Sequence, residues 1–165
     1  LKATALGRQE GFEAYKKALN FVALNYPNSE EGKQAQDIYS RVLPKLAAKE
    51  FVDDEAIDSF KLVYQFSVTE KEAALALQEK LNRALSFYNY ATMSTSIDYY
   101  TPEVILVIVH GLKTKLGARG FGDVLKDHKE YKIVKPHFEI STPNYKTIQI
   151  HKNLSDYLNI GVINP

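Results

Sequence analysis

The stretch that decides the fold is VILVIV at residues 104–109, which follows Pro102 and ends at His110-Gly111. Six apolar, mostly β-branched residues in a row predict a strand buried on both faces, because a strand with one solvent-facing side alternates apolar and polar residues. Each face of this strand therefore needs a covering layer. We expect it to be a central strand of a sheet that holds the main core.

The overall composition excludes several classes of function. The 165 residues are 45% hydrophobic and 25% charged, as in ordinary globular proteins, and the formal net charge is only +1. Charges so evenly balanced give no electrostatic footprint for nucleic acid or an anionic membrane surface. The sequence has no cysteine, which excludes disulfides, thiolate metal sites and a cysteine nucleophile. No apolar run approaches the roughly 18 residues that cross a bilayer, so we expect no direct membrane insertion.

Two segments share the same local pattern. Residues 60–89 and 104–131 each read as a strand, a short turn and a helix, which indicates an internal repeat. In the first segment, apolar and other residues alternate from Phe60 to Phe66, and Thr69 and Glu72 predict a capping box for the following helix. In the second, three glycines weaken the predicted helix and suggest that it packs close to the sheet.

Two further strands complete the predicted sheet. Residues 96–101 alternate like a strand and are joined to the central stretch by a tight connection, which predicts an antiparallel hairpin. Phe138 and Ile140 mark a fourth strand. The order predicts an α+β fold, a ferredoxin-like βαββαβ sheet of four strands with two helices, over residues 60–165. We expect its first and third strands to lie side by side and parallel.

The remaining segments are predicted to be helical or to link the two parts. Residues 1–50 predict a helical hairpin whose second helix is kinked or restarted at Pro44, and the acidic residues 51–59 predict a solvated linker. The tail favours a helix begun by Pro143, although residues 147–151 also alternate like a strand, and both interpretations stay open.

No motif in the sequence identifies a reaction. His110-Gly111 after an apolar strand is typical of the oxyanion loop of α/β-hydrolases, but the G-x-S-x-G elbow that these enzymes need is missing. The four histidines lack the spacing that places two metal ligands on one element. We therefore expect no catalytic, cofactor or metal site, and His110 is the first residue to inspect for one.

Aromatic residues on the predicted strands favour contact with protein. Tyrosine covers apolar area and keeps a polar tip, whereas the base-stacking signature of RNA-binding sheets is missing from the central strand. The second sheet face must be covered by the N-terminal hairpin, by the tail or by a partner. The candidate partner-binding residues are Val63, Gln65, Tyr99, Tyr100, Ile105, Val107 and Val109.

Two parts of the chain resemble a known family. The run YPNSEEGKQA at residues 26–35 resembles the junction between tetratricopeptide-type repeats of bacterial envelope proteins. The runs from His110-Gly111-Leu112 through residues 138–141 to Asn144-Tyr145-Lys146 and Tyr157-Leu158 resemble the C-terminal region of PorW/SprE-type repeat lipoproteins of Bacteroidota.

The resemblance implies a non-catalytic adaptor of the type IX secretion and gliding machinery, which binds other protein subunits in the periplasm. Because the chain begins with Leu1 and has no lipidated cysteine, we expect a C-terminal fragment whose parent is tethered to the outer membrane. An alternative from another class is a small-ligand-binding or regulatory ferredoxin-like domain, which rests on fold analogy.

Overall fold

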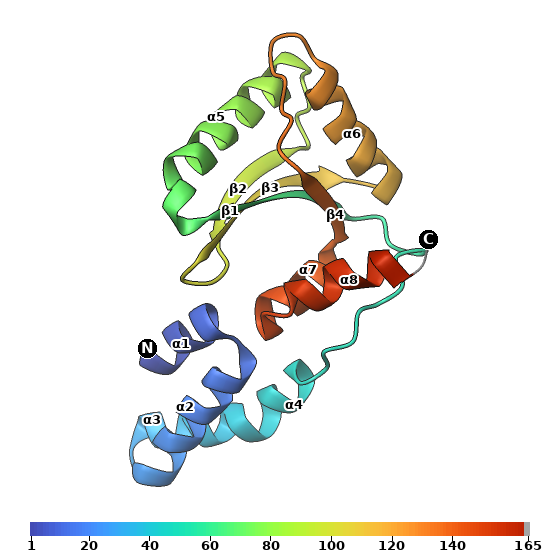
Figure 1. Ribbon diagram of the computed structural model, residues 1–165. Coiled ribbons are helices and arrows are strands. Elements are labelled where there is room, and N and C mark those ends of the chain that lie inside the picture. The colour runs from blue at the N-terminus through green and yellow to red at the C-terminus, as the bar shows by residue number, and fades with distance from the viewer. Residues whose placement is uncertain (164–165) are drawn as a thin grey trace. The chain divides into compact units, whose positions relative to one another are not determined.

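The apolar stretch 104–109 lies within β3 (Val104–Leu112), a central strand of a four-stranded sheet. The computed structural model describes residues 1–163, and Figure 1 shows its elements. The other strands are β1 (Phe60–Ser67), β2 (Ser94–Tyr99) and β4 (His137–Ser141). They lie in the order β2-β3-β1-β4, and every neighbouring pair is antiparallel. The predicted α+β class with a four-stranded sheet is confirmed.

The expected parallel pairing of the first and third strands was wrong. β1 and β3 are neighbours but antiparallel, with Val63 opposite Ile108 and Gln65 opposite Leu106. The helix after β1 returns the chain so that β2 runs in the direction of β1, and the tight turn at residues 100–103 then reverses it into β3. The strand order and the βαββαβ succession are compatible with the ferredoxin-like arrangement expected from the sequence.

Both helices of the repeat, α5 (Lys71–Phe87) and α6 (Lys115–Asp127), cover the same face of the sheet (Figure 1). The core between them consists of alternate strand residues and the inner stripes of the helices. Its members include Leu62, Tyr64, Leu81, Ile105, Val107, Val109 and Leu125, all 0% exposed. The prediction that both faces of β3 are buried is confirmed, because Leu106 and Ile108 on the opposite face are 0% and 1% exposed.

The capping box before α5 lies two residues earlier than predicted. A 3₁₀ turn (Val68–Glu70) precedes the helix, and the Ser67 N–H donates to Glu70 Oε2 at 2.8 Å. The predicted pair Thr69 and Glu72 does not form this box, because β1 continues to Ser67 and leaves its first free N–H groups there.

The glycines of α6 differ in their surroundings. A Cβ at Gly122 would lie 2.5 Å from His137 Nε2, whereas a Cβ at Gly120 would meet nothing within 4 Å. The expected close approach of the helix to the sheet is therefore found at Gly122.

The structure divides into two compact units, Val52–Tyr145 and a second one made of residues 1–51 with the chain from Lys146 onward. The first boundary lies in the predicted linker 51–59. The second lies inside α7 (Thr142–His151), so the tail groups with the N-terminal helices, whereas the sequence pattern predicted that it belongs to the sheet domain.

The N-terminal helices are α1 (Lys2–Glu10), α2 (Phe12–Asn25), α3 (Glu30–Asp37) and α4 (Leu43–Leu46). The expected single first helix is broken at Gly11, whose φ of +90° is readily adopted by glycine alone. The expected interruption at Pro44 is confirmed, since a π-helical turn (Ile38–Val42) separates α3 from α4. Proline removes a backbone donor there, and the Leu43 N–H reaches back to the Ile38 carbonyl.

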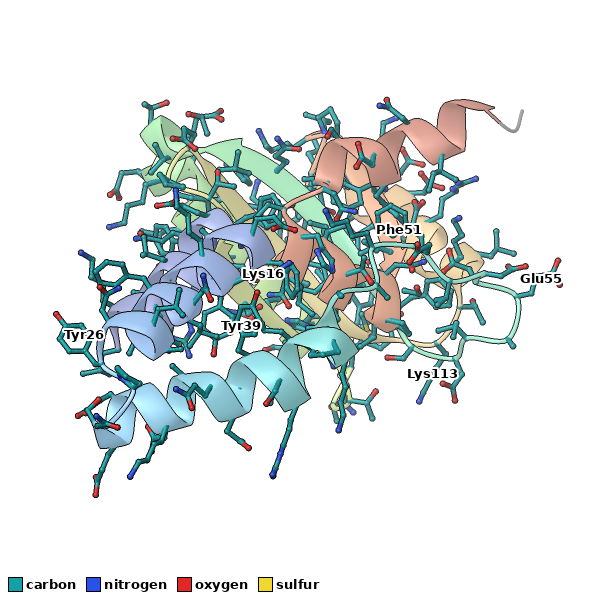
Figure 2. The ribbon with its side chains drawn as sticks, turned by 90° about the horizontal axis from the view of Figure 1, so that it is seen from below. Lys16, Tyr26, Tyr39, Phe51, Glu55 and Lys113 are labelled. Carbon is teal, nitrogen blue, oxygen red and sulfur yellow. The ribbon has the colours of Figure 1, made fainter. Side chains whose placement is uncertain are left out.

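The turn between α2 and α3 is tightly packed against the start of α3. Ser29 Oγ accepts a hydrogen bond from the Gly32 N–H at 2.9 Å and donates one to the Tyr26 carbonyl at 2.9 Å. A Cβ at Gly32 would lie 1.8 Å from that carbonyl oxygen, so only glycine fits there. Tyr26 itself is 57% exposed and is labelled in Figure 2.

The tail forms two helices, α7 and α8 (Leu154–Ile163), and the helical interpretation of residues 147–151 is confirmed. Ile150 packs against the core of Phe12, Leu19 and other buried residues of α2–α4. Lys152, with φ of +55°, separates the two helices. Within residues 1–163, no helix is both long and apolar enough to span a membrane.

Candidate functional site

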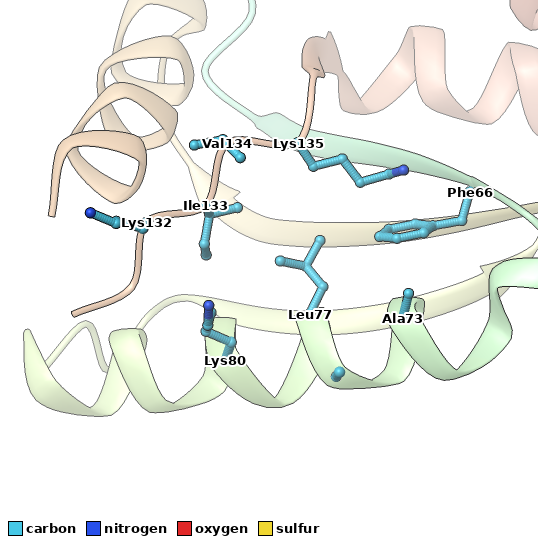
Figure 3. Close-up of a pocket in the computed structure, with 9 residues that line it drawn as sticks. Phe66, Ala73, Leu77, Lys80, Lys132, Ile133, Val134 and Lys135 are labelled. Carbon is cyan, nitrogen blue, oxygen red and sulfur yellow. The ribbon is translucent and has the colours of Figure 1, made fainter. Parts of the chain in front are cut away.

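An open groove lies beside α5, where residues 132–135 run past the helix (Figure 3). Its volume is about 320 Å³. Six of the lining residues are apolar and three are lysines: Phe66, Ala73, Ala76, Leu77, Ile133, Val134, Lys80, Lys132 and Lys135. In Figure 3, Leu77 rises from α5 toward Ile133, and Lys135 extends over Phe66. The groove combines an apolar floor with a basic rim.

The local sequence explains how residues 132–135 present these groups. The Ile133 N–H donates to the Leu125 carbonyl at 3.0 Å, which fixes the segment to the end of α6. Ile133 is then 4% exposed in the core, whereas its neighbour Val134 is 72% exposed. The flanking Lys132 and Lys135 lie on either side of this apolar pair, so the segment exposes an apolar side chain between two ammonium groups.

The three lysines differ in the contacts that their ammonium groups make. Lys80 Nζ donates to the Tyr131 carbonyl at 2.8 Å. Lys135 Nζ lies 3.9 Å from the centre of the Phe66 ring and 3.8 Å from Glu70 Oε1, which partly offsets its charge. The exposed Lys132 side chain makes no hydrogen bond or ion pair within residues 1–163. Lys132 is therefore the cation most available to a ligand.

His110 lies on the sheet face opposite α5 and α6, in a small polar network. Lys61 Nζ is 3.1 Å from His110 Nδ1, and Ser96 Oγ is 2.7 Å from Nε2. An ammonium group can only donate, so Nδ1 accepts and Nε2 carries the proton that is donated to Ser96. Burial lowers the pKa of His110, the charge of Lys61 lowers it further, and Asp98 acts in the opposite direction. This ring is held neutral.

The neutral tautomer limits what the network can do chemically. A serine nucleophile needs an unprotonated histidine nitrogen as its base, but here the Ser96 hydroxyl faces a protonated one. Asp98 accepts a hydrogen bond from the Tyr145 hydroxyl, and Lys61 Nζ lies 5.6 Å from the centre of the Tyr145 ring. Burial also lowers the pKa of Lys61. The contacts satisfy polar groups on a sheet face that also carries apolar side chains such as Leu106 and Ile108.

The predicted partner-binding residues separate into buried and exposed ones. Ile105, Val107 and Val109 are completely buried in the core beneath α5 and α6, Val63 is buried on the opposite face, and Tyr100 is 4% exposed. Solvent reaches only Gln65 and Tyr99, the latter 55% exposed. The seven residues therefore do not form one surface.

Sequence reasoning missed the groove, whose parts come from β1, α5 and residues 132–135. One signal was present: Lys-Ile-Val-Lys at residues 132–135 places two β-branched residues between lysines just before a strand. Among residues 1–163, no group of three or more histidine, aspartate or glutamate side chains could hold a metal ion.

No protein-family model, curated protein or solved structure matches the chain.

Proposed function

We propose that this chain is a non-catalytic module that binds another protein. The observation that carries the proposal is the groove beside α5, where an exposed valine and other apolar side chains lie between lysines. Apolar anchors ringed by polar groups are the usual composition of protein interfaces. The neutral, doubly hydrogen-bonded His110 favours the same interpretation, because it is not oriented as a general base toward Ser96.

We further propose that the module is an adaptor in a type IX secretion and gliding complex, placed in the periplasm by a parent chain tethered to the outer membrane. Support comes from the resemblance of residues 26–35 and of the runs after His110 to PorW/SprE-type lipoproteins. In this proposal the helices α2 and α3 end a tetratricopeptide-like array, and residues 60–141 are a ferredoxin-like domain. The closely packed turn at Ser29 and Gly32 is compatible with a junction between helical repeats.

Affinity capture from a native Bacteroidota envelope tests the proposal. The full chain, used as bait, is expected to recover subunits of the secretion machine. A bait with Ala76→Glu, which introduces a carboxylate into the groove, should recover less of them. Recovery of none of these subunits, together with clean monomeric behaviour of the bait, would contradict the adaptor role.

A second candidate function is small-ligand binding, and a second hollow favours it. It has a volume of about 430 Å³, within the range of ligand pockets, and lies where α5 ends and β2 begins. Neutral polar side chains line it, including Asn82, whose Oδ1 accepts from Thr95 Oγ1 at 2.7 Å. Thermal-shift screening against metabolites and glycans tests this candidate, and a flat response would remove it.

A further inference from the structure

We propose that the groove beside α5 binds a protein segment that carries carboxylates next to an apolar side chain. This inference rests on the proposed function and specifies the chemistry of the partner. The occupant is a stretch of polypeptide in which an aliphatic or aromatic residue enters between Leu77 and Ile133 and flanking aspartates or glutamates meet the lysines.

Charge complementarity identifies the acidic part of the partner. The groove lining contains three lysines and no acidic residue. Residues 126–135 add Lys126 and Lys129, so this stretch carries four lysines against two acids, Asp127 and Glu130. Lys132 makes no ion pair within residues 1–163, and the ion pair of Lys135 there is a long one, 3.8 Å to Glu70, beside its contact with the Phe66 ring. A carboxylate at this rim would gain attraction without first breaking a strong ion pair.

The shape of the groove favours a peptide side chain over a free lipid. Ala73, Ala76 and Leu77 form one face of α5, and two of these three residues are small, which leaves room for an incoming apolar group. The groove is open to solvent and holds about 320 Å³, at the lower end for pockets that enclose a ligand. A fatty chain would remain largely in water there, whereas a peptide can insert one side chain and keep its backbone solvated.

A displayed library of random peptides, selected on the full chain, supplies an unbiased probe. Two variants test the groove: Ala76→Glu, which adds a carboxylate at an exposed helical position, and Lys132→Glu, which reverses the free cation. Each has a matched control outside the groove, Ala5→Glu at an exposed position of α1 and Lys113→Glu at an exposed lysine. Lys113 lies in the turn after β3 and is labelled in Figure 2. Circular dichroism verifies that every variant is folded.

We expect selected peptides to combine aspartate or glutamate with leucine, isoleucine or phenylalanine. Lys132→Glu should weaken their binding by about 1.4- to 5-fold through the loss of an exposed ion pair, and the new carboxylate should add repulsion toward an acidic peptide. Replacing the peptide's acids by amides, or raising the salt to about 0.5 M, should also weaken binding. The control variants should bind like the wild type.

Three outcomes would overturn the inference. The first is that no selected peptide binds the wild-type chain more tightly than the Ala76→Glu variant. The second is that Lys132→Glu leaves peptide binding unchanged. The third is that decanoate displaces an apolar dye bound in the groove whereas no acidic peptide does, which would assign the groove to a fatty acid. If envelope capture still recovers secretion subunits in any of these cases, the adaptor role survives and only the groove chemistry is wrong.

Discussion

Alanine substitutions at two glycines of α6 test how closely this helix approaches β4. Gly120 and Gly122 lie in the helix interior, where alanine is favoured over glycine by about 1 kcal/mol. A Cβ at Gly120 has open space, whereas a Cβ at Gly122 lies 2.5 Å from Nε2 and 2.6 Å from Cε1 of His137. The two Gly→Ala substitutions therefore share their effect on the backbone and differ in packing.

The magnitudes follow from these surroundings. Gly120→Ala should raise the free energy of unfolding by about 0.5–1 kcal/mol. Gly122→Ala gains the same amount, but the His137 ring must move. This ring is 5.5 Å from the ring of Tyr64 and its side chain is only 16% exposed, so it has little room. Overpacking of this kind costs about 1–3 kcal/mol. The two variants should differ by about that cost, with Gly122→Ala the less stable.

Urea unfolding followed by far-ultraviolet circular dichroism measures the difference. A third variant, Gly122→Ala combined with His137→Ala, removes the obstructing ring, and the alanine at residue 122 should then no longer be unfavourable relative to His137→Ala alone. If Gly122→Ala stabilises the protein as much as Gly120→Ala does, α6 does not lie as close to β4 as described, and the reasoning fails.

Three further predictions concern the polar network, the start of α5 and the α2–α3 turn. Because folding lowers the pKa of His110, the unfolded chain takes up a proton at a higher pH than the folded protein does, so the free energy of unfolding should decrease below about pH 6.5. His110→Gln should make this decrease smaller, and equal urea midpoints of the variant and the wild type at every pH would contradict the prediction. Ser67→Ala should lower the free energy of unfolding by about 1 kcal/mol and Thr69→Ala by less. A lower melting temperature for Thr69→Ala than for Ser67→Ala would instead support the capping box of Thr69 and Glu72 predicted from the sequence. Gly32→Ala should destabilise the helices by more than about 2 kcal/mol, since its Cβ would lie 1.8 Å from a carbonyl oxygen, and an unchanged melting temperature would be incompatible with this turn.

Periodicity was sufficient to locate the sheet but not to orient its central strands. The runs at residues 60–66 and 104–109 became β1 and β3 because side-chain alternation and continuous apolarity are local properties. Whether two strands run parallel depends on the whole path between them, and here the hairpin at residues 100–103 reverses the chain. The break at Gly11 was missed for a related reason. Gly11 lies close to Lys152, which is far away in the sequence, and a Cβ at Gly11 would lie 2.9 Å from Lys152 Cγ.

The candidate site was harder to predict because it is assembled from separate elements. The strand that contains Phe66 and the helix after it were both predicted from sequence, but each pattern by itself predicts burial of its apolar residues. Exposure at the groove arises because Ile133, which was not placed in any element, takes the buried position and leaves Val134 in solvent. The hydrogen bond from the Ile133 N–H to the Leu125 carbonyl and the packing of Ile133 in the core hold this arrangement.

The same alternation explains why the predicted partner residues do not form one surface. Ile105, Val107 and Val109 point to one face of β3, and the antiparallel pairing with β1 places them beside Phe66, Tyr64 and Leu62 under the helices. The opposite face carries Leu106, Ile108 and then His110, where the strand becomes polar. Since Ile105, Val107 and Val109 are buried by the fold itself, a partner must recognise apolar groups that solvent reaches. Val134 between two lysines meets that requirement, which is why the groove, and not the sheet, is the surface to test first.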